Sequence, residues 1–190
     1  MNTRTHRSVR RSTRYTVAVG LGMAILALTS CGDDGGRGYA VPDRLCGIEI
    51  DADALAPLLP DGKEITERKF DVGSERLSCT LSVDSDFSLS VKGDLLAADA
   101  DPFKSADWSM RLGGDSRPSP SALESGALIR DSLAVAVKPC RYEDSARRYA
   151  VLVELVGSNQ SPEDSAERGL ALSKFADDFV PAAVQAQGCA

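Results

Sequence analysis

Residues 77–91 alternate between apolar and polar side chains, and this alternation constrains the fold more than any other feature of the sequence. The odd positions hold the apolar members Leu77, Cys79, Leu81, Val83, Phe87, Leu89 and Val91. A period of two places such side chains on one face of a β-strand and the polar ones on the other. Because the segment is longer than a typical strand, we expect an antiparallel hairpin with one buried face.

The turn of this hairpin is predicted at Asp84-Ser85-Asp86. A three-residue loop pairs Leu81 with Leu89 and keeps the apolar residues of both arms on one face. A two-residue loop would instead place Leu81 opposite Ser88. The apolar pattern therefore predicts the three-residue loop.

Shorter apolar runs indicate further strands. They are expected over residues 63–72, 108–112, 133–137 and 149–155, with a loop over 139–147 between the last two. Residues 113–126 are rich in turn-forming residues and are predicted to form a mobile loop. Trp108, the lone tryptophan, lies beside this loop; it fits the core better than a ligand groove.

One helix is predicted before these strands in the sequence, and one after them. The first is short, lies between residues 45 and 60, and has Asp51 or Asp53 as its cap. The second is C-terminal, with Ser161 as N-cap and Pro162 in the first helical position. We expect Pro181 to kink or interrupt it. Gly188 is expected to end it.

The C-terminal helix carries an apolar face at helical spacing, formed by Leu172, Phe175, Ala176, Phe179 and Ala183. A helix with such a face can cover the apolar face of a sheet. The predicted fold class is therefore α+β: an antiparallel β-sheet with the C-terminal helix packed on one face and two disulfides. It forms a single domain over residues 44–190, preceded by segments 1–30 and 31–43.

Segment 1–30 has the organisation of a signal peptide. It contains five arginines and no acidic residue, and an apolar run over 16–28 follows the basic part. This run is shorter than the roughly 20 residues that span a bilayer. Segment 31–43 contains several glycines and two adjacent aspartates, which predicts a flexible tether.

The sequence Leu28-Thr29-Ser30-Cys31 resembles the lipobox of bacterial lipoproteins, with an aliphatic residue and two small residues before cysteine. The resemblance implies cleavage between Ser30 and Cys31 and a lipid on the Cys31 thiol, which attaches the protein to the bilayer. An ordinary signal peptide with an incidental Cys31 is the alternative. Arg10-Arg11 leaves open export by the twin-arginine route rather than the general one.

Four cysteines remain after Cys31: Cys46, Cys79, Cys140 and Cys189. An even number in an exported chain indicates two disulfides. We favour Cys46–Cys79 with Cys140–Cys189, which makes two sequential loops, and an interlaced pairing stays open. The part of the chain after residue 30 has no C-x-x-C spacing and no histidine, so we predict neither a metal site nor a cofactor.

Composition limits the functions of the exported part. Removing the five N-terminal arginines from 22 basic residues leaves 17, against 28 acidic residues, a net charge of 17 − 28 = −11. This balance argues against nucleic-acid binding, which needs clustered cations. The only histidine, His6, lies in the signal segment, so histidine-based catalysis is excluded once that segment is cleaved.

Acidic pairs are the remaining candidates for chemistry. Asp51-Ala52-Asp53 is explained by capping and Asp84-Ser85-Asp86 by a turn, while Asp99-Ala100-Asp101 lacks the spacing of an EF-hand calcium loop. Pairs of carboxylates in a cleft could also hydrolyse glycosides. We therefore predict a binding protein, with an envelope hydrolase and an accessory subunit of a membrane complex as alternatives. The expected binding region is 99–126, for an unknown envelope protein or a small ligand.

The lipobox, the acidic tether, Leu45-Cys46-Gly47 and the terminal Gly188-Cys189 together resemble small lipoproteins of the actinobacterial cell envelope. This resemblance covers most of the chain, and the lipobox is its specific motif. It implies an extracytoplasmic, membrane-attached α+β domain. It supplies no catalytic residues.

Overall fold

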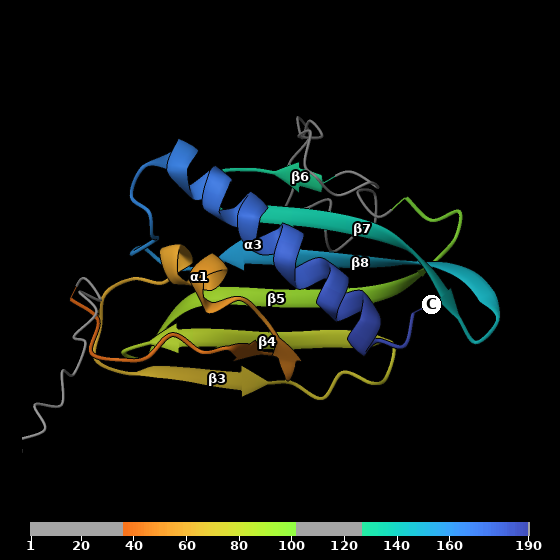
Figure 1. The fold of residues 1–190 in the computed structure, drawn as a ribbon, viewed down its shortest axis with the longest axis horizontal. Helices are drawn as coiled ribbons and strands as arrows, with labels where there is room; N and C mark the ends of the chain where they lie inside the picture. The colour runs from red at the N-terminus through yellow and green to blue at the C-terminus, as the bar shows by residue number, and fades with distance from the viewer. Residues whose placement is uncertain (1–35, 102–126, 190) are drawn as a thin grey trace, which may run out of the picture. The chain divides into compact units, whose positions relative to one another are not determined.

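Antiparallel strands form one large sheet in the computed structural model, which describes residues 36–101 and 127–189 (Figure 1). The strands run in the spatial order β3-β4-β5-β8-β7-β6. Their bounds are β3 Ile65–Lys69, β4 Arg76–Val83, β5 Asp86–Ala97, β6 Ala127–Ile129, β7 Leu133–Tyr142 and β8 Ser145–Leu155. All of these pairings are antiparallel.

The remaining elements lie on one side of this sheet (Figure 1). They are the two-residue strands β1 Arg44–Leu45 and β2 Ile48–Glu49, helix α1 Ala52–Leu55 with the 3-10 turn η1 Ala56–Leu58, and helix α3 Ser165–Ala186. Helix α3 crosses the sheet and packs chiefly on β7. The predicted fold class, an antiparallel sheet with a C-terminal helix on one face, is confirmed.

The predicted apolar face of α3 forms the core with the sheet. Leu172, Phe175 and Phe179 are fully buried, and the rings of Phe175 and Phe179 stack with centroids 5.4 Å apart. The same cluster includes Leu81, Leu89 and Val91 of the hairpin, together with Tyr149, Val151 and Val153 of β8. Alternation along the strands therefore points these residues at the helix.

A second apolar cluster lies on the other face of the sheet, where the sequence pattern indicated a single buried face. Its members, Leu128, Leu133, Val135, Val137, Ala150 and Leu152, are at most 5% exposed. Their neighbours Ala134 and Ala136 belong instead to the cluster beneath α3. Strands β7 and β8 are thus buried on both faces, which explains their nearly continuous apolar sequence.

The β4–β5 hairpin corrects the predicted turn. Its loop has two residues, Asp84 and Ser85, both with positive φ (50° and 72°), and Val83 pairs with Asp86. A β-bulge near Leu81 restores the register beyond the turn, because Ser88 is an extra residue on β5. Leu81 still faces Leu89 as predicted. The bulge, which the alternating pattern does not reveal, lets a tight turn and a single apolar face coexist.

The expected loop over 139–147 is wrong, since β7 and β8 continue through these residues to a turn at Glu143-Asp144. Pro139 fits in β7 because β6 pairs only with residues 134–136, so among the described strands β7 has a neighbour on one side at this point. The predicted strand over 63–72 and the short helix capped by Asp51 are confirmed with tighter bounds. The predicted strand over 108–112 lies outside the described residues.

Helix α3 begins later than predicted. Its N-cap is Asp164, whose carboxylate accepts hydrogen bonds from the backbone N–H of Ala166 and Glu167, both at 2.9 Å. Ser161 precedes the helix because the carbonyls after it bind a side chain, as described below. The helix runs through Pro181 without interruption and ends before Gly188, which has φ 77°.

Both favoured disulfides are present, Cys46–Cys79 and Cys140–Cys189. The first ties the β1–β2 turn to β4, and the second ties Cys189, three residues after the end of α3, to β7. All described residues belong to one compact unit, Asp33–Ala190. Among the described helices, none is long and apolar enough to cross a membrane.

Candidate ligand-binding cavity

A cavity of about 650 Å³ opens at the end of the sheet that carries the β4–β5 turn. Three segments distant in sequence form its walls: residues 59–61 after η1, residues 83–88 around the turn, and residues 156–163 between β8 and α3. Arg37 adds a basic side chain from the N-terminal side. The volume is in the range of small-molecule sites.

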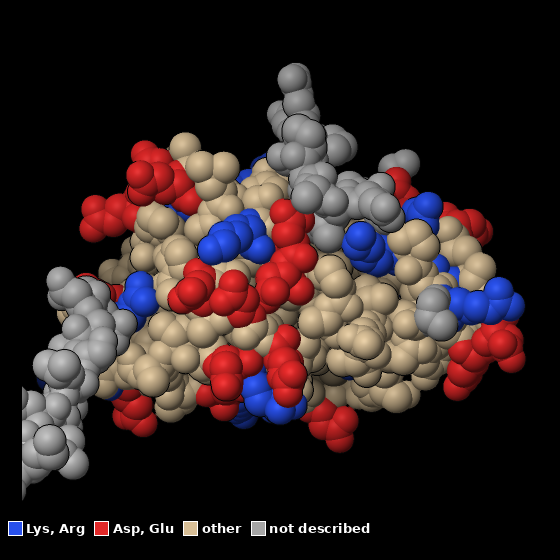
Figure 2. Space-filling view, viewed as in Figure 1, with Lys and Arg blue, Asp and Glu red and all other residues tan. Residues whose placement is uncertain are grey.

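Most of the charged side chains in the cavity walls are acidic. Asp61, Asp84, Asp86 and Glu163 line the cavity with Arg37, which gives four carboxylates to one guanidinium. Figure 2 shows acidic side chains also gathered over the start of α3. The local field therefore favours ligands that carry positive charge or several hydrogen-bond donors.

Asp84 has a fixed position at the cavity edge. Its Oδ1 accepts hydrogen bonds from the backbone N–H of Lys63 at 2.9 Å and of Glu64 at 3.0 Å. Its own backbone N–H donates to the Glu64 carbonyl at 3.0 Å. The turn and the segment before β3 thus form one rigid wall, which supports a preformed site.

The first described residues bind to this same end of the domain. The Gly38 N–H donates to the Gly62 carbonyl, the Tyr39 hydroxyl to the Pro60 carbonyl, and Arg37 Nε lies 4.0 Å from Asp61 Oδ1. Burial raises the pKa of Tyr39; Asp61 and Asp84 also raise it, and Arg37 opposes them. Tyr39 therefore stays neutral at physiological pH, and its hydroxyl donates a hydrogen bond to the Pro60 carbonyl. These contacts fall within the expected tether, 31–43.

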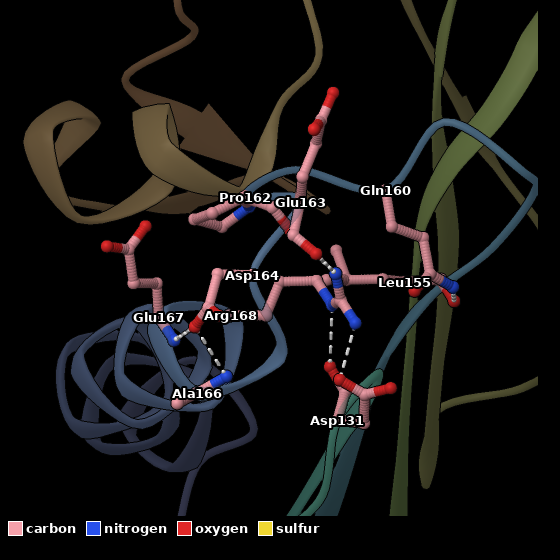
Figure 3. A network of polar contacts seen from close by, with 9 residues as sticks. All are labelled: Asp131, Leu155, Gln160, Pro162, Glu163, Asp164, Ala166, Glu167 and Arg168. Carbon is pink, nitrogen blue, oxygen red and sulfur yellow. Dashed lines mark hydrogen bonds and ion pairs between the residues drawn. The ribbon is translucent and has the colours of Figure 1, made fainter.

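Arg168 holds the loop over residues 156–163 in place (Figure 3). Its Nη1 donates to the carbonyls of Pro162 and Glu163, both at 2.7 Å, while Nε donates to the Asp131 carbonyl at 3.0 Å. Gln160 Nε2 donates to the Leu155 carbonyl at 3.1 Å at the other end of the loop. The third wall of the cavity is thereby fixed to α3 and to the β6–β7 turn.

Several predicted site residues lie outside the described part of the chain. Ser30 and Cys31, the expected cleavage and lipid-attachment residues, precede it. Of the expected binding region 99–126, only residues 99–101 are described, and they do not line the cavity. The lipid anchor and this binding region therefore stay predictions.

The acidic pairs behave largely as the sequence indicated. Asp51 caps α1 and accepts from the Asp53 N–H at 2.9 Å. Asp84 lies in the predicted turn, and Asp84 and Asp86 also line the cavity, which the pattern did not reveal.

One cluster of potential metal ligands exists among the described residues. The sulfur atoms of Cys46 and Cys79 and a Glu67 carboxylate oxygen lie within 4.8 Å of one another. Both sulfur atoms are in a disulfide, so neither is a thiolate ligand. Glu67 Oε1 instead accepts from the Cys46 N–H at 2.8 Å. This group is a structural contact.

The chain gives no match in comparisons with protein-family models, with curated proteins or with solved structures.

The sequence pattern missed this cavity. The run Gly157-Ser158-Asn159-Gln160-Ser161 is polar and rich in turn formers, which is a loop signal. Nothing in the linear sequence places that loop beside Asp61 and Asp84, because the strand order brings them together.

Proposed function

We propose that the protein is a lipid-anchored, extracytoplasmic binding protein of the bacterial cell envelope, without enzymatic activity, which holds a small polar ligand in the acidic cavity. The observation that carries the proposal is the cavity of about 650 Å³, walled by three fixed segments. Four carboxylates and one guanidinium at its surface favour a ligand with cationic or multiple donor groups.

The anchor and the cavity support each other. Arg37 at the cavity is six residues after Cys31, the predicted lipid-attachment residue. Six residues of extended chain span at most about 20 Å. A lipid on Cys31 would therefore keep the cavity close to the bilayer surface, where a membrane-associated ligand or an envelope partner is within reach.

The binding proposal is tested with protein purified from membranes without denaturation. Native mass spectrometry is expected to show a bound species, and thermal-shift screening of wall fragments, amines and cations to show stabilisation. Ser158→Trp introduces a large side chain at an exposed cavity position, and Ser145→Trp is its control at an exposed position on β8. Loss of the ligand in both variants, or in neither, contradicts binding in this cavity.

The anchor is tested by replacing Cys31 with alanine. The variant is expected to remain an unprocessed precursor without lipid, seen as a higher intact mass. Normal maturation of that variant contradicts the lipobox prediction. Cross-linking in intact cells, with this variant as control, identifies any envelope protein that the anchored form contacts, and stable recovery with one membrane complex would favour the accessory-subunit alternative.

A carboxylate-dependent hydrolase is the second candidate, because four carboxylates line one cavity. Hydrolysis of a wall polysaccharide that Asp86→Asn and Glu163→Gln each abolish would establish it. Unchanged polysaccharide in the presence of folded wild-type protein would leave the binding function.

A further inference from the structure

Strand β3 has an open edge. It is an outermost strand of the sheet, and within the described residues it pairs with β4 alone (Figure 1). The Phe70 N–H donates to the Ser78 carbonyl, and the Glu64 carbonyl accepts from Asp84. Hydrogen bonding alternates along an antiparallel pair. The backbone groups of Ile65, Glu67 and Lys69 are therefore directed away from β4.

This edge is exposed and regular. Residues 66–69 are exposed, and Phe70 and Val72 just beyond them are 38% and 37% exposed. The Glu67 side chain by itself is 25% exposed, and its Oε1 also accepts the Cys46 N–H. No proline or bulge interrupts the five residues of β3. Such an edge can accept another strand unless its side chains oppose the pairing.

The side chains of β3 carry a charge pattern that is complementary to itself. Glu67 and Lys69 lie on the same face of the strand, with Lys69 Nζ 3.8 Å from Glu67 Oε1. In an antiparallel pair of two β3 strands centred on Arg68, Glu67 of each copy faces Lys69 of the other. Both positions have outward-directed backbone groups, so the two residues also form hydrogen-bonded pairs.

We propose that β3 is a homodimerisation edge, which pairs antiparallel with β3 of a second copy in the register centred on Arg68. The two sheets then join into one continuous sheet across a two-fold axis. The charges on the strand oppose pairing with unrelated strands and select this partner and register.

Neighbouring registers are disfavoured by like charges. Centring the pair on Glu67 would place the two Glu67 side chains opposite each other. Centring it on Lys69 would oppose the two Lys69 side chains and set Glu67 against Asp71 twice. Like charges directly opposite one another destabilise a strand pair, so the register centred on Arg68 is the one in which acid meets base on this face.

Arg68 itself faces its symmetry mate in this register, on the opposite face of the strand. The Arg68 guanidinium carbon lies 5.1 Å from the centroid of the Phe70 ring, so the guanidinium leans toward Phe70 of its own strand. One like-charge pair is thus set against two opposite-charge pairs. Figure 2 shows acidic and basic side chains intermixed along the lower margin of the molecule, near this edge.

The short edge predicts a weak dimer. The area buried by pairing five residues of each strand is smaller than the roughly 1,200 Å² that stable interfaces bury, so we expect association only at high micromolar concentration in solution. Attachment of both copies to one membrane would raise their effective concentration and strengthen the dimer.

The test is sedimentation equilibrium of the mature chain, residues 31–190 with Cys31→Ser, from about 10 μM to about 500 μM. The wild-type edge is expected to self-associate across this range. Glu67→Lys and Lys69→Glu are each expected to weaken self-association about tenfold, because both ion pairs become like-charge pairs. Glu67→Lys also removes the acceptor of the Cys46 N–H, so Lys69→Glu is the variant that leaves this hydrogen bond in place. Glu143→Lys, the same charge change in the β7–β8 turn, serves as the control and is expected to associate as the wild type does.

Two rescue experiments separate a specific edge from a general charge effect. A mixture of the Glu67→Lys and Lys69→Glu chains is expected to form heterodimers, because each like-charge pair becomes an opposite-charge pair. The double variant Glu67→Lys/Lys69→Glu is expected to self-associate again. Circular dichroism and thermal melting confirm that each variant is folded. A monomeric wild type at the highest concentration, unaffected single variants, or failure of both rescues overturns the proposal.

Discussion

Arg168 binds Asp131 through both the side chain and the backbone of that aspartate. The Arg168 side chain is 9% exposed, and its Nη2 lies 2.5 Å from Asp131 Oδ1 while its Nε donates to the Asp131 carbonyl. The same guanidinium also donates to two carbonyls of the loop before α3. One buried cation thus joins the β6–β7 turn, the cavity loop and the C-terminal helix.

Arg168→Met is expected to lower the free energy of unfolding by about 2–4 kcal/mol, because four hydrogen bonds are lost and three backbone carbonyls lose this donor. Asp131→Ala should cost less than about 1 kcal/mol, since the carboxylate is 60% exposed and the backbone acceptor remains. Urea unfolding measures both. Equal losses would mean that the side-chain ion pair, rather than the carbonyl contacts, provides the stabilisation.

Gly93 is required beneath the Tyr149 ring. A Cβ at residue 93 would overlap the Tyr149 hydroxyl and lie 2.8 Å from Cζ of the ring and 3.1 Å from the Leu77 Cβ. Because Tyr149 is 1% exposed and cannot move into solvent, Gly93→Ala should destabilise the protein by about 1–3 kcal/mol. Adding Tyr149→Phe removes the overlapping hydroxyl and should recover part of this loss. If the double variant lost more unfolding free energy than the two single variants lose together, this explanation would be contradicted.

Each disulfide is expected to stabilise the fold by about 2–4 kcal/mol. They close segments of 33 and 49 residues, so loop entropy predicts nearly equal effects for Cys46→Ala/Cys79→Ala and Cys140→Ala/Cys189→Ala. Urea unfolding of the two double variants gives the comparison. Intact mass after alkylation without reduction should show that these four cysteines are not alkylated, because they are in disulfides. Two or more alkylated cysteines would show that a bridge is not formed.

Asp177 is expected to make the stability of the protein depend on pH in the acid range. Burial raises the pKa of Asp177 above its usual 3.8, and Lys138 partly opposes the shift. The folded state therefore holds this proton more tightly than the unfolded state, and its contribution to stability is lost as pH rises through the raised pKa. Asp177→Asn should then melt higher than wild type near pH 7 and show no such gain below pH 3.8.

Asp178→Asn is the matched control for this variant. Asp178 lies next to Asp177 on α3, and its Oδ2 accepts the Asp51 N–H at 2.9 Å, whereas Asp177 Oδ1 is buried without a hydrogen-bond partner among the described residues. The amide of the control keeps an acceptor oxygen, so no gain is expected at either pH. Equal gains for both variants would indicate a general effect of reducing negative charge.

Local patterns predicted the elements that depend on neighbouring residues. Alternation over 77–91 gave the hairpin arms, and helical spacing of Leu172, Phe175 and Phe179 gave the buried face of α3. The preference for sequential cysteine pairs also gave the observed disulfides. The boundaries of the strands and of the helix were less predictable, since the bulge at Ser88 and the N-cap at Asp164 depend on hydrogen bonds beyond the pattern.

The sequence by itself determined the fold class, because side-chain periodicity and turn chemistry are properties of short segments. Tertiary structure alone decided that Asp61, Asp84 and Glu163 line one cavity, that Arg168 fixes its loop, and that Glu67 and Lys69 lie along an open sheet edge. The cavity residues are separated by tens of positions in the sequence, and the open edge of β3 follows from the strand order. These relationships exist only after the strand order brings distant segments together, so no local pattern records them.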